Sequence, residues 1–174
     1  AYASGYKKSI DVFTNILEKG LPKGAVYSSK VPPPEGKEEF KTPSGTRYWV
    51  RDARAMTARP WKQTTVGTHV LENTDKDSKI LDYGAGPKAT QTQRLKDAGF
   101  KDVTAHDLPE SRQSEHHTED ALDHKYDVVM ASNVLNVQSD DKQLTSTLDQ
   151  LKEVLNDGGH VIANFPSTPN HHED

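Results

Sequence analysis

The sequence contains no cysteine, which excludes disulfide bonds, thiolate metal sites and a cysteine nucleophile. It also has no run approaching the roughly 18–20 apolar residues that a membrane-spanning helix needs, and no signal-peptide pattern opens it. From these absences we expect a protein of the reducing cytoplasm that has no membrane partner.

Apolar side chains are also scarce, at 32% of the residues, and aromatic ones make up only 7%. A length of 174 residues suits one compact domain, or one domain with a tail. The net charge of −4 is too small for a wholly disordered chain. We therefore expect a small core that carries long polar segments.

Charge is unevenly distributed along the chain. Residues 1–67 carry 12 Lys and Arg against 6 Asp and Glu, whereas residues 68–174 carry 10 against 20. This division predicts a basic N-terminal segment (1–67) joined to an acidic core domain (68–174), and a basic surface suits a phosphate-bearing partner such as nucleic acid. The alternative is that the two sets of charges attract each other in the folded protein.

The second half alternates short apolar runs with amphipathic stretches. Strands are predicted at 79–83, 103–106, 126–131 and 160–165, and helices at 88–98 and around Leu144, Leu148, Leu151 and Leu155, ended by 157–159. Strands that alternate with helices predict a parallel sheet with right-handed crossovers. The expected fold class is therefore α/β: a three-layer sandwich around a mainly parallel, Rossmann-like sheet.

A glycine-rich turn follows the first of these strands, in the run Asp82-Tyr83-Gly84-Ala85-Gly86. Glycines let a ligand approach the backbone closely, and the helix that follows offers free N–H groups. Asp107 ends the next strand, where a carboxylate can accept hydrogen bonds from ribose hydroxyls. The alternative is a helix cap or turn role for Asp107.

The runs ILDYGAG, EDAL (119–122), YDVVMASNVLN and VLNDGGHVIANFP, with Asp107 between the first two, resemble successive motifs of class I S-adenosylmethionine-dependent methyltransferases. The resemblance covers about 78–166. It implies S-adenosylmethionine as cofactor, with the glycine turn at its methionine end, Asp107 at the ribose, and the pair 120–121 at the adenine. Ser132 and Asn133 would face the acceptor side. The predicted cofactor-binding residues are Asp82, Tyr83, Gly84, Ala85, Gly86, Asp107, Leu108, Asp120, Ala121, Ser132 and Asn133.

Two features depart from common patterns of that family. Lys88 stands where a third glycine is usual, and because an ammonium is unfavourable beside a sulfonium, its side chain should point away. The Asn-Pro-Pro-aromatic signature of amino-methylating DNA enzymes is absent, since 132–136 reads SNVLN. The resemblance therefore favours the small-molecule and general branch, although a nucleic acid stays open as methyl acceptor, and no oligomeric state is predicted.

Two other functions compete with an active methyltransferase. One is a non-catalytic subunit of the same fold that binds a protein or nucleic-acid partner. The other is a different nucleotide-binding Rossmann-like enzyme, because a dinucleotide fingerprint tolerates Ala89 as its third small residue.

A general base is needed only if the acceptor must lose a proton. The candidates are His106, His124 and Tyr83, with Asn133 able only to orient. For each histidine the competing interpretation is a solvated surface side chain. The histidine pairs 116–117 and 171–172 lie in polar, acidic stretches without fixed geometry, so we predict no metal site.

The N-terminal segment offers a helix at 9–19 and strands at 25–31 and 46–51, separated by a polar, proline-rich loop. A complete family sheet has further elements after the 160–165 strand, which suggests a circular permutation that places them first. In that case the 46–51 strand would lie beside the 159–165 strand. The rival hypothesis is an N-terminal extension, with the remaining sheet elements supplied elsewhere.

Basic and aromatic residues gather just after the 46–51 strand. Arg54, Arg59, Trp61 and Lys62 are candidates to bind phosphate and to stack on a base. The alternative is that Trp61 packs beneath the sheet while the charged side chains are solvated.

Overall fold

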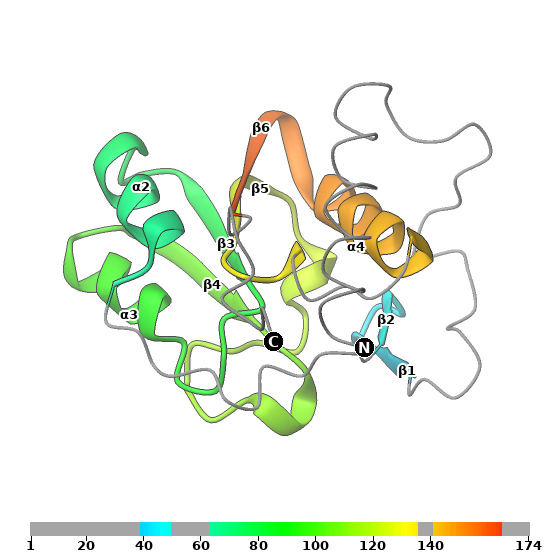
Figure 1. Ribbon diagram of the computed structural model, residues 1–174. Coiled ribbons are helices and arrows are strands. Elements are labelled where there is room, and N and C mark those ends of the chain that lie inside the picture. Colours follow the sequence, from blue (N-terminus) through cyan, green and yellow to red (C-terminus); the bar gives the residue numbers. More distant parts are fainter. Residues whose placement is uncertain (1–38, 50–62, 136–140, 165–174) are drawn as a thin grey trace, which may run out of the picture.

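The computed structural model describes residues 39–49, 63–135 and 141–164. Its centre is a four-stranded parallel sheet in the order β4-β3-β5-β6 (Figure 1). The strands are β3 (Lys79–Tyr83), β4 (Asp102–His106), β5 (Tyr126–Ala131) and β6 (Leu155–Ala163), and the helices are α2 (Thr65–Asn73), α3 (Thr90–Asp97) and α4 (Asp141–Glu153), with short 3₁₀ turns η1 (Pro109–Ser111) and η2 (Ala121–Asp123). The predicted α/β class and parallel sheet are therefore confirmed.

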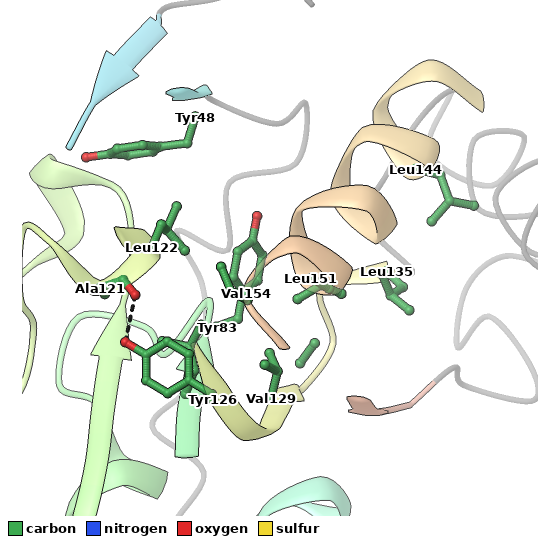
Figure 2. Close-up of a cluster of buried hydrophobic side chains, with 12 residues drawn as sticks. Tyr48, Tyr83, Ala121, Leu122, Tyr126, Val129, Leu135, Leu144, Leu151 and Val154 are labelled. Carbon is green, nitrogen blue, oxygen red and sulfur yellow. Dashed lines mark hydrogen bonds between the residues drawn. The ribbon is translucent and has the colours of Figure 1, made fainter. Parts of the chain in front are cut away.

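The two faces of the sheet bury different side chains, because successive residues of a strand point in opposite directions. Ile80 packs with Val66 and Leu95 in the cluster under α2 and α3. Leu81 packs with Leu144 and Leu151 in the cluster under α4, which Figure 2 shows. The result is the expected three-layer sandwich, with α2 and α3 on one side and α4 on the other (Figure 1).

The strand order reverses at β3. The chain passes from β3 to β4 on one side, and β5 pairs with β3 on the other, with Asp82 opposite both Ala105 and Met130. In open parallel sheets, ligands bind outside the carboxyl ends of the strands at such a reversal. The DYGAG turn leaves the sheet at this point.

A two-stranded antiparallel hairpin packs beside the sheet on the α4 side (Figure 1). It consists of β1 (Glu39–Lys41) and β2 (Arg47–Trp49), with Phe40 opposite Tyr48. The permuted arrangement is therefore wrong, because β2 pairs with β1 in a separate sheet and does not lie beside β6. The pairing also places a strand in the polar stretch predicted to be a loop. The predicted helix at 9–19 and strand at 25–31 lie outside the described residues.

The boundary between α4 and β6 also differs from the prediction. The helix ends at Glu153, so Leu155 belongs to β6 and not to the leucine face of the helix. Asp157, Gly158 and Gly159 lie inside the strand, where the register with β5 jumps from Tyr126–Leu155 to Val128–His160. Glycine is common in such irregular strands, so the same residues that suggested a helix stop accommodate a bulge.

Two further features were not predicted. Helix α2 precedes β3 and is capped by Thr64, whose hydroxyl accepts a hydrogen bond from Gly67 N at 2.9 Å. At the β4 edge of the sheet, the chain that follows β4 returns and His117 forms an isolated parallel bridge with Ala105. In the described part of the chain, no helix is long and apolar enough to cross a membrane.

Candidate functional site

The glycine turn after β3 is fixed by the end of β4. Gly84 N and Ala85 N both donate to the carbonyl of His106, at 2.9 and 3.0 Å. Gly84 and Gly86 have φ values of +73° and +76°, which L side chains rarely adopt. A Cβ at position 84 would lie 2.7 Å from Val134 Cγ2, whereas one at Gly86 would meet nothing within 4 Å. The turn thus packs against the segment after β5 but leaves open space at Gly86.

Asp107 lies against this turn, as the sequence predicted. Its Oδ2 accepts a hydrogen bond from Gly86 N at 2.7 Å, and its Oδ1 accepts one from Leu108 N at 2.7 Å. Burial raises the pKa of this carboxyl, opposed by the two backbone donors. Because a carboxylate has about four acceptor positions, Asp107 can still accept further hydrogen bonds.

Asp82 is buried beneath the turn and faces α3. Its Oδ2 accepts a hydrogen bond from the Thr92 hydroxyl at 2.8 Å. Burial raises the pKa of Asp82 to about 7, opposed by the hydrogen bonds from Thr92 and reinforced by the nearby charge of Asp107. Helix α3 begins after Ala89, which has a left-handed φ of 46° and makes no side-chain cap. Asp82 therefore holds the first turn of α3, which shapes the glycine turn from below.

Other predicted site residues are directed elsewhere. The Tyr83 hydroxyl donates to Gln150 Oε1 at 2.5 Å, so this side chain faces α4. Asp120 is half-exposed and lies 2.9 Å from His124 Nε2, and that hydrogen bond lowers the pKa of Asp120. Ala121 is fully buried, and its carbonyl accepts a hydrogen bond from the Tyr126 hydroxyl (Figure 2). Leu108 is partly buried and packs against the cluster under α4.

The end of β5 supplies polar groups beside the turn. Ser132 Oγ is buried and has no hydrogen-bond partner among the described residues. Asn133 is exposed and adopts a left-handed φ of 57°. Its amide pairs with that of Asn164, which follows β6 and which sequence reasoning missed. The signal was available, because Asn164 ends the HVIAN run of a predicted neighbouring strand.

Sequence reasoning also missed the residues that tie the hairpin to the site. Arg112 donates from Nε to the Asp107 carbonyl at 3.0 Å and from Nη2 to the Tyr48 hydroxyl at 2.8 Å. Tyr48 packs edge-on against His106, with ring centroids 5.0 Å apart. His117 Nε2 lies 2.9 Å from the Gly86 carbonyl. The contacts of Tyr48 with Arg112 and His106, and of His117 with Gly86, join residues far apart in sequence, so no local pattern predicts them.

The remaining candidates divide into two groups. The side chain of Lys88 is exposed and borders a surface hollow over α3 with Thr90 and Asp97. Arg54, Arg59, Trp61 and Lys62 lie outside the described residues. Within the described ranges, no group of three His, Asp or Glu could hold a metal ion.

The described residues fit an adenosine-bearing cofactor such as S-adenosylmethionine. The space above Gly86 lets a ligand reach the backbone, the Asp107 carboxylate stands beside it, and the buried Ser132 hydroxyl is ready for a polar partner. Gly84 and Val134 bring the glycine turn and the end of β5 into contact. The site is therefore continuous along the carboxyl edge of the sheet, from the glycine turn to the end of β5.

Among the comparisons with known proteins, a family profile gives a match that agrees with this geometry. A search of curated proteins and a search of solved structures found no match. A family profile described as a methyltransferase domain matches residues 44–173, from the turn of the hairpin through the whole parallel sheet. Because this match spans well over half of the chain, the protein belongs to the methyltransferase-domain family of class I, S-adenosylmethionine-dependent methyltransferases.

Proposed function

We propose that this protein binds S-adenosylmethionine at the carboxyl edge of its sheet and transfers the methyl group to an acceptor. The observation that carries the proposal is the 2.7 Å contact between Gly86 N and Asp107 Oδ2, at the point where the strand order reverses. The family match supports it over a dinucleotide enzyme.

Different residues of the chain would contact different parts of the cofactor. Asp107 would bind the ribose hydroxyls through its remaining acceptor positions. The backbone of the 84–86 turn would contact the methionine portion, where only glycine avoids a clash with Val134. Leu108, which is only partly buried, would supply apolar surface for the adenine, and Ser132 a hydroxyl, whereas the fully buried Ala121 offers the ligand no surface. In this arrangement Asp82 is a positioning residue, because it acts through α3.

The cofactor would supply an activated methyl group on a sulfonium, so the protein needs little covalent chemistry of its own. Its task is to hold donor and acceptor in line at short distance and to exclude water, effects worth several kcal/mol. The hairpin contributes indirectly, since Arg112 fixes the backbone of Asp107 to Tyr48.

Calorimetric titration tests the binding half of this proposal. We expect heat with S-adenosylmethionine and with S-adenosylhomocysteine, and none with NAD. Asp107→Ala should weaken binding at least 10-fold, because hydrogen bonds to a charged group are lost, whereas Asp157→Ala, in the exposed bulge of β6, should leave it unchanged. Equal affinities for Asp107→Ala and the parent protein would contradict the assignment.

Transfer of labelled methyl groups tests the catalytic half. Cofactor binding without transfer to any acceptor would favour the non-catalytic subunit. The proposal that residues 1–67 contact nucleic acid has a separate test, which is binding to short DNA and RNA at two salt concentrations. Affinity that does not fall with salt would exclude phosphate contacts as the main contribution.

A further inference from the structure

Two asparagines meet at the acceptor side of the proposed site. Asn133 follows β5 and Asn164 follows β6, and the two strands are paired up to Ala131 and Ala163. The contact between Gly84 and Val134 places the segment that carries Asn133 directly against the glycine turn. Asn133 is exposed at this edge, so its amide is accessible to an acceptor molecule.

Hydrogen bonding determines which way both amides face. The backbone N–H of Asn133 can only donate, and it lies 2.7 Å from Asn164, so the atom that Asn164 turns toward it must be Oδ1. The Nδ2 group of Asn164 is then the donor to Asn133 Oδ1, at 2.8 Å. Because its oxygen is engaged, Asn133 presents its NH₂ group outward. The exposed end of the pair is therefore a hydrogen-bond donor.

The groups considered as general bases are engaged in other contacts. His106 is buried between the rings of Tyr48 and Tyr83. The Tyr83 hydroxyl donates to Gln150, and His124 is paired with Asp120. Each of these three side chains is thus held by its own neighbours, whereas an acceptor that is already ionised needs no base. This arrangement favours a nucleophile that is already ionised at neutral pH.

We propose that Asn164 is a positioning residue that fixes Asn133 as a hydrogen-bond donor, and that the methyl acceptor is a carboxylate. This inference rests on the proposed methyl transfer. A carboxylate oxygen accepts the hydrogen bond from Asn133 Nδ2 and forms an O–C bond as the S–C bond breaks. The carboxylate loses its negative charge and the sulfonium its positive charge. The products are a methyl ester and a neutral thioether, so no proton has to move.

Asn164→Asp tests the orientation without any reaction. The new carboxylate still accepts from the Asn133 backbone N–H but cannot donate, so the Asn133 amide should rotate and turn its NH₂ group toward position 164. In ¹⁵N-correlated NMR spectra, the side-chain amide protons of Asn133 should shift and exchange more slowly with solvent. Unchanged shifts and exchange would overturn the proposed orientation.

Selectivity tests the acceptor. Benzoate, phenol and benzylamine share one ring and differ in the nucleophile, and a short DNA duplex represents nucleic acid. We expect labelled methyl transfer to benzoate, in an ester that alkali hydrolyses, at least 10-fold faster than to the others. Asn164→Asp should reduce this transfer about 10-fold or more, because a donor to a charged acceptor is lost. Faster transfer to phenol, amine or DNA, or none to benzoate, would overturn the carboxylate assignment.

Two controls distinguish a wrong acceptor assignment from a general effect of the added charge and from a loss of cofactor binding. Asn73→Asp adds the same charge at the end of α2, away from the carboxyl edge of the sheet, and should leave selectivity unchanged. Cofactor affinity, measured by calorimetry, should be the same for Asn164→Asp and the parent protein. Absent cofactor binding in the parent protein would contradict the proposed function, whereas the NMR result on Asn133 does not depend on the cofactor.

Discussion

The two faces of the sheet are held together in different ways. Under α2 and α3, apolar packing such as that of Leu95 of α3 with Val103 of β4 surrounds one buried carboxyl group, that of Asp82, which is hydrogen-bonded to Thr92 of α3. On the α4 side, apolar packing is supplemented by polar contacts to the hairpin, and these span long separations, as between Gln150 Nε2 and the Arg47 carbonyl. The first face shapes the glycine turn, while the second connects the site to the N-terminal segment.

The face under α2 and α3 should be the more sensitive to loss of side-chain volume. Leu95→Ala removes a fully buried side chain under the sheet and should lower the free energy of unfolding by about 3–5 kcal/mol. Urea denaturation measures this change. The matched substitution on the other face is Leu151→Ala, also fully buried. A substantially larger loss of unfolding free energy for Leu151→Ala than for Leu95→Ala would show that the α4 face is the more sensitive one.

Asp82 should make the first face dependent on pH. Its pKa of about 7 in the folded protein is above the value of about 3.9 for an unfolded chain. Ionisation is therefore less favourable in the folded state, and the contribution of Asp82 to stability falls as pH rises from about 4 to 7. We expect a loss on the order of 3 kcal/mol.

Urea titrations between pH 4 and 8 measure this effect, and Asp82→Asn should remove most of it. A smaller dependence of the same sign should remain, because burial also raises the pKa of Asp107 and of Asp149. An identical pH profile for Asp82→Asn and the parent protein would show that Asp82 is not the source.

Asp123 should be the main attachment of the hairpin turn. Its Oδ1 accepts hydrogen bonds from the hydroxyls of Thr42 and Thr46, at 2.5 and 2.8 Å. Asp123→Ala should cost about 1–2 kcal/mol and expose the hairpin to proteolysis before the sheet unfolds. Hydrogen exchange at 39–49 measures the opening. Exchange that rises equally in β3 and β5 would mean that the hairpin and the sheet open as one unit.

The smallest effect is expected at Tyr48. Tyr48→Phe removes only the acceptor of the Arg112 hydrogen bond and keeps the ring packed against His106. We expect a cost of about 1 kcal/mol in stability and a cofactor affinity changed by less than 5-fold. Thermal denaturation and calorimetry measure the two quantities. A severe loss of cofactor affinity would make the hairpin part of the binding site itself.

Local patterns were sufficient for the parts of the fold that depend on local sequence. The run 126–131 is apolar apart from Asp127, as is typical of a buried parallel strand, and β5 has these bounds. Gly99, predicted to end a helix, has a φ of +97° just after α3. The meeting of the glycine turn with Asp107 was also predicted, because both lie at the carboxyl ends of adjacent parallel strands.

The incorrect predictions and the missed residues lie where contacts between residues distant in sequence determine the local structure. The turn between β1 and β2 is held by Asp123, some 80 residues away, so the sequence around 39–49 gave no indication of its pairing. The glycines at 158–159 suit both a helix stop and a strand bulge, and only the register with β5 distinguishes the two. Asn164 and Arg112 depend likewise on which strand ends become neighbours.

The close approach of Gly84 to Val134 has a consequence for ligand binding. The turn proposed to hold the cofactor and the segment proposed to face the acceptor leave no room for a Cβ between them, so neither can shift toward the other without displacing it. Binding of the cofactor should thus change the affinity for the acceptor, and binding of the acceptor the affinity for the cofactor. Thermodynamic linkage requires the factor to be the same in both directions, whichever molecule arrives first.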